Sequence, residues 1–281
     1  LISKAIPDLA KSLSPDGIPR VAEAIMTTDS FSKISLFEGN ADGGPFQILG
    51  IAKGAGMIMP DMATMLCFVL TDLWLDAQNL DRAVSAAVEA SFNRISVDGD
   101  TSTNDMVLVL AQGRTEAEAP SPGDLDEFNN GLTRVMTELA TMIVRDGEGA
   151  TKVVHVKVKG AATAEDALTA ARTIANSSLV KTAFYGQDPN WGRIMVALGR
   201  SGILMREEKV SIWLDGIKIV EGGLGTGEGA EKEAADKMTN KEFDLTIDLH
   251  LGEHEDRIIT CDLTHEYITI NADYRRANSG L

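Results

Sequence analysis

The chain has 281 residues, of which 44% are hydrophobic, 24% charged and 5% aromatic. This composition is typical of a folded globular protein of one large domain or two ordinary ones, and it excludes a mainly disordered or fibrous chain. Lys and Arg number 26 against 42 Asp and Glu, which gives a net charge of −16. Because so acidic a surface repels phosphate backbones and anionic lipids, we expect neither nucleic acid nor a membrane as a partner.

The cysteines and the apolar stretches indicate the compartment. Cys67 and Cys261 are too few for a disulfide framework, and both lie in apolar runs where a free thiol behaves as a small hydrophobic side chain. The longest apolar stretch, Met57 to Leu70, is interrupted by Asp61 and is shorter than the ~20 residues of a membrane-spanning helix. We therefore expect a cytoplasmic protein. Because the first residue, Leu1, is not a methionine, we also expect an upstream segment in the native protein.

The first half of the chain predicts one strand, two helices and a long loop. The apolar run Met65 to Leu70 indicates a buried strand, and a helix is expected over Asp81 to Phe92. The stretch Glu116 to Asp126 contains two prolines and a glycine, and because proline disfavours helix interiors and sheet ladders we expect a surface loop there. Apolar side chains then recur at three- and four-residue steps from Asp124 to Arg145, which predicts an amphipathic helix.

The second half alternates strands with helices. Every second residue from Val154 to Val158 is apolar, which predicts a half-buried strand. Thr163 to Asn176 begins with a capping pattern and continues as an Ala-rich helix. Val210 to Val220 predicts a hairpin with an Asp-Gly turn at its centre, and Phe243 to Leu249 alternates like a further strand. The class is mixed α/β (α+β), with layered sheets covered by helices.

Three patterns that look like ligand motifs stand in the wrong context. His250 to His254 has the H-x-x-E-H spacing of zinc peptidases, but that motif requires a helix, and the alternation through Leu249 predicts a strand that ends at Gly252. The residues from Asp98 begin like a calcium loop yet lack its required glycine and glutamate. The glycines of Gly222 to Gly229 miss the spacing of a nucleotide loop and predict a flexible loop. We expect no metal ion and no other cofactor.

The segment from Ile51 to Thr71 has the parts of an N-terminal nucleophile. Lys53 precedes three small residues, and Thr64 opens the apolar run that follows. In such enzymes a hydroxyl attacks the carbonyl of the preceding residue, the ester hydrolyses, and the freed α-amine serves as the base for that hydroxyl. An α-amine suits this role because its reference pKa is ~7.7–8.0. From this pattern alone, a structural threonine that enters a strand is the simpler interpretation, since threonine is common in strands.

Six segments resemble, in order along the chain, the glutamate N-acetyltransferase (ornithine acetyltransferase) family of arginine biosynthesis. They are AIMTTD (24–29), GIAKGAGM with PDMATML (50–66), SFNRISVDGDTSTND (91–105), DGEGATK (146–152), VKTAFYGQDPNWGRI (180–194) and CDLTHEYITINADYR (261–275). Matches that span nearly the whole chain are far more specific than any single motif. The resemblance implies the fold of the self-processing aminopeptidases and ornithine acetyltransferases.

The resemblance also implies a reaction. The bond between Ala63 and Thr64 matches the self-cleavage site, so residues 1–63 would be the C-terminal part of an α chain and residues 64–281 a β chain that begins at its nucleophile, Thr64. The implied mechanism is ping-pong: N-acetylornithine acetylates Thr64, ornithine leaves, and glutamate takes the acetyl group to give N-acetylglutamate. Acetyl-CoA as a second donor stays open, and the implied assembly is an α2β2 heterotetramer.

Five residues match the family's substrate-binding positions: Thr27, Lys53, Thr64, Glu148 and Asn271. Lys53 is a mobile cation able to hold the α-carboxylate that N-acetylornithine and glutamate share. Glu148 can pair with the amino end of the substrate. The side chains of Thr27 and Asn271 can orient the substrate through hydrogen bonds.

Two features depart from the family pattern. The family's oxyanion donors come from a Thr-Gly pair in an S-T-G segment before the first helix, and no such segment stands ahead of Leu1. At the other end, Arg276 occupies the place of a Ser or Thr hydroxyl, and the residues from Arg276 to Leu281 are atypical. Two further interpretations therefore stay open: a self-processing aminopeptidase or amidohydrolase with water as the acceptor, although those enzymes generally cleave at serine, and a catalytically silent relative without the oxyanion segment.

Overall fold

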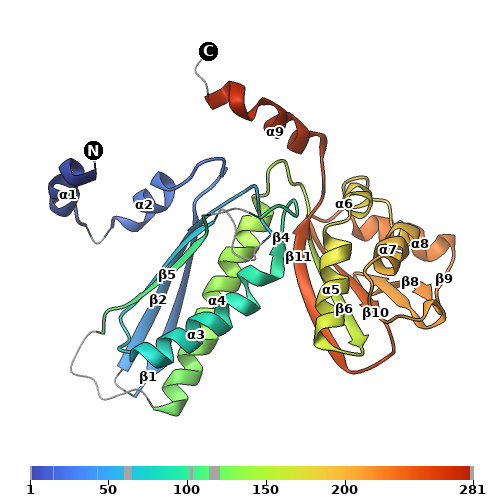
Figure 1. The fold of residues 1–281 in the computed structure, drawn as a ribbon, viewed down its shortest axis with the longest axis horizontal. Coiled ribbons are helices and arrows are strands. Elements are labelled where there is room, and N and C mark those ends of the chain that lie inside the picture. Colours follow the sequence, from blue (N-terminus) through green and yellow to red (C-terminus); the bar gives the residue numbers. More distant parts are fainter. Residues whose placement is uncertain are drawn as a thin grey trace.

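Two β-sheets lie side by side in the protein, and each packs against helices (Figure 1). The structure is a computed structural model that describes residues 2–14, 16–42, 44–59, 65–101, 104–113 and 121–278, with side chains as far as residue 272. Within these ranges, one sheet has four strands and the other has seven. This architecture confirms the mixed α/β class predicted from the sequence.

The smaller sheet comes from the first half of the chain. Its strands, in spatial order, are β1 (Lys33–Ala41), β2 (Gly44–Lys53), β3 (Leu66–Thr71) and β5 (Met106–Ala111). The pairs β1–β2 and β2–β3 are antiparallel, whereas β3 and β5 are parallel. Helices α3 (Ala77–Ala90) and α4 (Pro122–Arg145) cover one face, where Ile48 and Val69 of the sheet share a buried core with Leu132 and Met136 of α4.

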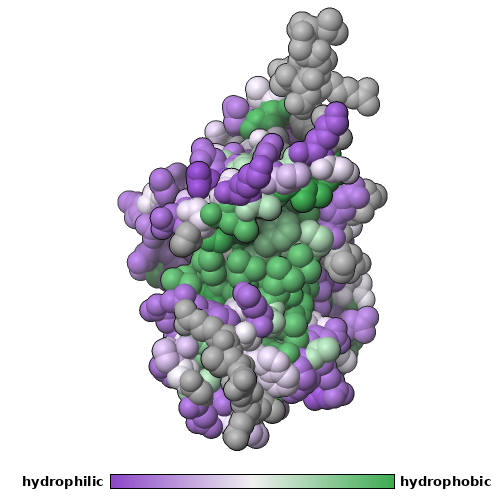
Figure 2. All heavy atoms as spheres, turned by 90° about the vertical axis from the view of Figure 1, so that its left-hand side faces the viewer, coloured by the Kyte–Doolittle hydropathy of each residue, from purple (hydrophilic) through white to green (hydrophobic). Residues whose placement is uncertain are grey.

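The opposite face of the smaller sheet is apolar and open to solvent within the described residues. Leu36, Leu70, Met106, Leu108 and Leu110 are between 39% and 52% exposed. Figure 2 views the molecule from this side and shows a broad hydrophobic area over the sheet. Strands β3 and β5 thus carry apolar residues on both faces, which gives an uninterrupted apolar run in the sequence. The predicted strand is confirmed as β3, but only its α4-facing side is buried.

The larger sheet comes mainly from the second half of the chain. Its strands, in spatial order, are β4 (Ile95–Ser96), β11 (His254–Cys261), β6 (Val153–Ala161), β10 (Glu242–Asp248), β7 (Ser211–Leu214), β8 (Ile217–Glu221) and β9 (Leu224–Gly225). Its helices are α5 (Ala164–Ala175), α6 (Ser178–Tyr185), α7 (Trp191–Gly199) and α8 (Glu228–Lys237). Val156 and Leu245 of the strands share a second buried core with Ala171 of α5 and Leu198 of α7.

The two sheets meet at the C-terminal end of α4. There Ile143 and Val144 of α4 share a core with Val153 of β6 and with Cys261 of β11. The loop between α4 and β6 therefore lies at the junction of the sheets. Three helices reach beyond the sheets at this end of the molecule, in the upper part of Figure 1. They are α1 (Ile2–Lys11), α2 (Ile18–Ala24) and α9 (His265–Asn278). Two short 3-10 helices are η1 (Phe92–Arg94) and η2 (Glu207–Lys209).

Several predicted elements are confirmed. The amphipathic helix that we expected to end at Arg145 is α4, and the expected alternating strands are β6 and β10. Helix α5 begins after Thr163, whose hydroxyl accepts a 3.0 Å hydrogen bond from the Asp166 amide as the capping pattern predicts. In the hairpin of β7 and β8, Asp215 and Gly216 have φ values of 44° and 81°, which are typical of the tight turn that an Asp-Gly pair favours.

Two boundaries differ from the prediction. Helix α3 begins four residues earlier than expected because the Asp76 carboxylate caps it with a 2.8 Å bond from the Asn79 amide. The predicted loop over Glu116 to Asp126 is wrong in its second part, since α4 already begins at Pro122. Proline is compatible with a first helical turn, where its missing N–H would have no partner. Residues 114–120 lie outside the described part of the chain.

The glycine-rich stretch from Gly222 to Gly229 is also more ordered than predicted. Gly222 and Gly223 have φ values of 56° and 78° and form a turn that lets β9 pair with β8, and α8 begins at Glu228. Because glycine adopts positive φ at little cost, these residues build a tight connection here.

None of the helices in the described ranges combines the length and the apolar character needed to cross a bilayer.

Candidate active site

Hydrogen bonds join the loop that follows β2 to the loop that precedes β1. The Asp29 carboxylate accepts a 2.6 Å hydrogen bond from the Gly54 amide and a 3.0 Å bond from the Thr27 amide. Lys53, the last residue of β2, places its Nζ 3.4 Å from the Thr27 Oγ1. Two of the predicted substrate-binding side chains, those of Thr27 and Lys53, are thus adjacent.

The same loop also contacts the second pair of predicted residues, Glu148 from the loop after α4 and Asn271 from α9. The Glu148 amide donates a 2.9 Å hydrogen bond to the Ala55 carbonyl, and the Asn271 amide group donates a 2.8 Å bond to Glu148 Oε2. A Cβ atom added to Gly56 would lie 2.6 Å from the Glu148 carboxyl carbon, so only glycine allows this close approach. Four side chains from four distant segments therefore meet around one short loop.

Thr64 and Ala63, the predicted nucleophile and its neighbour, lie outside the described residues. The described chain resumes at Met65, whose backbone is held on both sides. Its amide donates a 2.6 Å hydrogen bond to Asp105 Oδ1, and its carbonyl accepts a 3.0 Å bond from the Met106 amide. The residue bonded to Thr64 is therefore fixed at the start of β5. Asp105 was not predicted as a site residue.

Asp105 is also a carboxyl group whose pKa is raised. Burial raises the pKa of Asp105 to about 6, and the bond from the Met65 amide and the charge of Lys53 oppose this rise. A carboxyl group with a pKa near 6 can exchange protons close to neutral pH, which is typical of functional sites.

Asp29, which binds the Thr27 amide, also belongs to a buried ion cluster. Lys33 of β1 is fully buried, with its Nζ 2.7 Å from Asp29 Oδ1 and 2.5 Å from Asp146 Oδ2. Burial acts to raise the pKa of Asp29, but the bonds from Lys33 and from the Gly54 and Thr27 amides outweigh it, so that this pKa is lowered. Asp146 also accepts hydrogen bonds from the Ser30 amide and hydroxyl. Asp29, Lys33 and Asp146 were not predicted from the sequence, although two of them stand in the MTTD and DGEGATK segments.

The end of the loop farther along the chain from Lys53 is bound by an acidic residue. Asp98 accepts hydrogen bonds of 2.7 and 3.0 Å from the Met57 and Ile58 amides. The pKa of the Tyr267 hydroxyl of α9 is raised to about 12, first by burial and then by the negative charges of Asp98, Asp100 and Glu148. Three carboxylates thus act on one hydroxyl. The residues around this loop thus include the cation of Lys53 and several carboxylates.

The described part of the chain contains no group of three or more His, Cys, Asp or Glu side chains arranged to hold a metal ion. In the H-x-x-E-H stretch, His250 has a positive φ of 49° and His254 begins β11, so the stretch connects two strands and is not a helix, as predicted. The strand before it, β10, ends at Asp248 and not at Gly252 as expected. The free thiols of Cys67 and Cys261 are both buried, and burial raises the pKa of Cys67 to about 12. Arg276 continues α9 at a position where side chains are not described, and residues 279–281 lie outside the described range.

Comparison with known proteins gives the family. The sequence model described as the ArgJ family matches residues 1–276. The arginine biosynthesis bifunctional protein ArgJ of Syntrophotalea carbinolica is 51% identical over 277 residues, which are 98% of this chain and 70% of that protein. The glutamate N-acetyltransferase of Methanocaldococcus jannaschii is 48% identical over 262 residues, which are 90% of this chain and 65% of that protein.

A solved structure agrees with these sequence matches. The crystal structure of the arginine biosynthesis bifunctional protein ArgJ from Bacillus halodurans superimposes with a TM-score of 0.70 at 43% identity, and the match covers 74% of this chain and 98% of that chain. The resemblance noted in the six sequence segments is thereby confirmed, as is the fold that it implied. The chain belongs to the ArgJ family.

Proposed function

We propose that the protein is an acyltransferase of arginine biosynthesis that moves the acetyl group of N2-acetyl-L-ornithine to L-glutamate, giving N-acetylglutamate and ornithine. Its family membership supports this function, since relatives are named as bifunctional arginine biosynthesis proteins and as a glutamate N-acetyltransferase. The observation that carries the proposal is the meeting of Thr27, Lys53, Glu148 and Asn271 around one loop.

The charges around this loop suit the donor. N-acetylornithine has a carboxylate at one carbon and a free ammonium group at the end of its side chain. Lys53 binds the carboxylate, and Glu148, with Asp98 and Asp100 near it, binds the ammonium group. Glutamate shares the α-carboxylate and binds Lys53 in the same way. Thr27 and Asn271 orient the two substrates by hydrogen bonds.

The reaction proceeds by a ping-pong mechanism through an acetylated Thr64. Self-cleavage between Ala63 and Thr64 first frees the α-amine of Thr64, which then takes the proton of the Thr64 hydroxyl as that oxygen attacks the acetyl carbonyl. The amide bond of N-acetylornithine breaks, and its nitrogen leaves with a proton as ornithine. The α-amine of glutamate attacks the ester, and the hydroxyl of Thr64 is restored. Residues 1–63 thus end the α chain, residues 64–281 form the β chain, and the assembly is α2β2.

Turnover with and without the acceptor tests this function. The full chain is incubated with N-acetylornithine, and N-acetylglutamate, acetate and ornithine are quantified. We expect one N-acetylglutamate for each ornithine when glutamate is present, and at most one ornithine per site when it is absent. Sustained release of acetate without glutamate would instead identify a hydrolase. Absence of any ornithine would identify a catalytically silent relative.

A further inference from the structure

Two side-chain oxygen atoms in the described part of the chain are buried and accept no hydrogen bond. They are Oδ1 of Asn93, in η1, and Oδ2 of Asp105, directly before β5. A buried acceptor without a donor costs free energy, so most such atoms in folded proteins have a partner. Asn93 and Asp105 line the same cavity. One ligand with two donor groups could therefore satisfy both oxygens.

Contacts with neighbouring groups hold these two side chains in place. Asn93 Nδ2 donates a 2.7 Å hydrogen bond to Glu89 Oε2. Because a carboxylate only accepts, this bond identifies the other atom of the amide, the one without a partner, as the oxygen. Asp105 Oδ1 accepts a 2.6 Å bond from the Met65 amide, so Oδ2 is the oxygen that is left for another donor.

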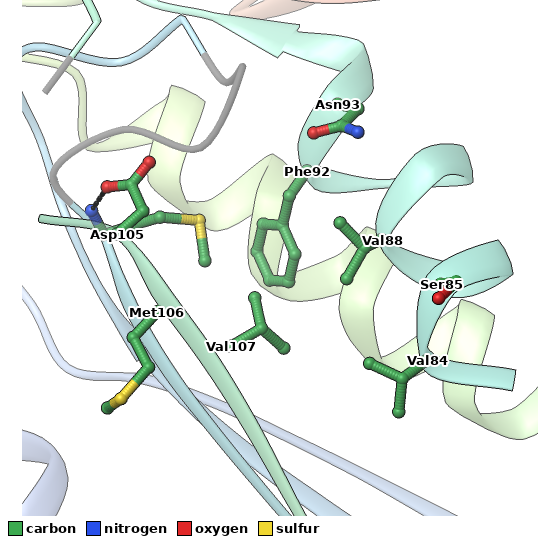
Figure 3. A pocket seen from close by; sticks show the side chains of 9 residues that line it. Val84, Ser85, Val88, Phe92, Asn93, Asp105, Met106 and Val107 are labelled. Atoms are coloured by element: carbon green, nitrogen blue, oxygen red, sulfur yellow. Dashed lines mark hydrogen bonds between the residues drawn. The ribbon is translucent and has the colours of Figure 1, made fainter. Parts of the chain in front are cut away.

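The cavity between the two oxygens has mostly apolar walls. It has a volume of about 220 Å³ and is lined by nine residues, all of them in the described part of the chain. Figure 3 shows Asp105 at one end and Asn93 at the other, with the Phe92 ring between them and Val88 and Val107 on facing walls. An apolar cavity of about 150 Å³ holds one benzene molecule, so this cavity has room for about nine non-hydrogen atoms.

The charge of the lining side chains selects a cation. Asp105 is the single ionisable residue among them, and the polar groups that α3 and η1 contribute, Ser85 and Asn93, are neutral. A buried carboxylate favours an ammonium partner, because an unpaired buried charge is costly. An amino acid suits the cavity less well, since no Lys or Arg lines it to bind the α-carboxylate.

We propose that this cavity binds a short aliphatic diamine, a ligand that is not a substrate of the proposed acetyl transfer. One ammonium group binds Asp105 Oδ2, and the alkyl chain packs against Phe92, Val88 and Val107. The second amine donates a hydrogen bond to Asn93 Oδ1, where the Glu89 carboxylate bonded to Asn93 adds negative charge. A diamine of about four to six carbons fits the volume of the cavity.

Titration calorimetry of the full chain with 1,5-diaminopentane near neutral pH tests the site. Asp105→Asn removes the charge but retains an acceptor for the Met65 amide, and we expect the Kd to rise by roughly 10- to 150-fold. Pentylamine has the same chain without the second donor, so it should bind the unaltered chain roughly 2- to 10-fold more weakly than the diamine. Asp76→Asn is the matched control and should bind normally, because asparagine also caps α3.

A cavity-filling variant and the pH dependence give independent readouts. Val88→Phe places a ring in the cavity and should abolish binding. In the unaltered chain the affinity should rise with pH up to about 6 and then level off, because Asp105 binds the cation when it is deprotonated. The diamine keeps its charge over this range, since alkyl amines have pKa values of ~10. Lys53 of β2 is the cation that acts on Asp105 from the sheet, and it opposes the rise of this pKa.

Glu148→Gln separates this cavity from the proposed substrate site, and its diamine affinity should equal that of the unaltered chain. Loss of binding in Glu148→Gln would place the diamine at the substrate site and overturn the proposal. So would the absence of binding heat in the unaltered chain, or an unchanged Kd in Asp105→Asn. If a variant no longer unfolds cooperatively on heating, the pH dependence of the unaltered chain decides, and an affinity that is constant between about pH 5 and pH 8 contradicts the site.

Discussion

Glu148 Oε2 accepts a 2.8 Å hydrogen bond from Asn271 Nδ2 across 123 residues of sequence. This bond joins the loop after α4 to the exposed helix α9, and it holds the Glu148 carboxylate against the backbone of Gly56. The contact therefore links three segments at the point where the proposed substrate ammonium group binds.

Removing the charge of Glu148 should weaken substrate binding. Glu148→Gln keeps the acceptor for Asn271 but loses the negative charge. A hydrogen bond between charged groups contributes about 1.5–3 kcal/mol, so we expect the KM for N-acetylornithine to rise by roughly 10- to 150-fold. Steady-state kinetics measure this change. The matched control is Glu255→Gln, whose exposed ion pair with Lys157 lies outside the site. An unchanged KM in Glu148→Gln would exclude this residue from binding the substrate.

A methyl group on Gly56 should displace the Glu148 carboxylate. The added Cβ of Gly56→Ala would lie 2.6 Å from the carboxyl carbon of Glu148, which is closer than packed atoms approach. We expect the KM for N-acetylornithine to rise, as in Glu148→Gln, because the carboxylate is moved away from its position. Gly229→Ala on α8 is the control, because its Cβ would meet no atom within 4 Å and alanine favours helices. Equal kinetics for the two variants would contradict the close packing that we describe.

Lys33 should be needed for the folded state. Lys33→Met leaves the Asp29 and Asp146 carboxylates buried without their cation. Breaking a buried ion pair on one side costs about 3–5 kcal/mol, so we expect the free energy of unfolding in urea to fall by this amount. Lys157→Met breaks an exposed pair and should cost less than about 1 kcal/mol. A small effect in both variants would show that the cluster does not hold the loop of Asp29 and the loop of Asp146 together.

The raised pKa of Asp105 should make the stability of the folded chain depend on pH. Its folded-state pKa is raised to about 6, so the folded chain binds more protons than the unfolded chain and stability falls as the pH rises from about 4 to 6. Asp105→Asn removes this penalty. We expect the variant to be more stable than the unaltered chain at pH 7, by about 1 kcal/mol after screening by solvent, and equally stable near pH 4. Chemical denaturation at the two pH values tests this prediction. A variant that is less stable at pH 7 would contradict the raised pKa.

Local sequence patterns were sufficient for much of the fold. The helix that ends at Arg145, the cap at Thr163 and the turn at Asp215 all depend on contacts within a few residues, and they were predicted correctly. The start of α4 was missed because Pro122 stands at the first helical position, where proline is tolerated, yet it also marks loops. The environment of β3 was missed because an apolar run does not show which of its two faces is covered.

The site was predictable only as far as the family resemblance extends. It indicated Thr27, Lys53, Glu148 and Asn271, and the structure brings these four together. Lys33 resembles an ordinary polar residue of a strand, because one of its two partners is 113 residues away. Asp105 lies in no periodic pattern, and only the parallel pairing of β3 with β5 places it at the Met65 amide. Long-range contacts of this kind cannot be deduced from spacing.

The acetylation of Thr64 is the central claim, and intact-mass analysis of the chain after exposure to N-acetylornithine without glutamate tests it most directly. We predict two fragments, the second beginning at Thr64, and a gain of one acetyl group on the second fragment that disappears when glutamate is added. An unbroken chain that turns over fully, or an acetyl group that attaches and transfers equally well in Thr64→Ala, would contradict the account.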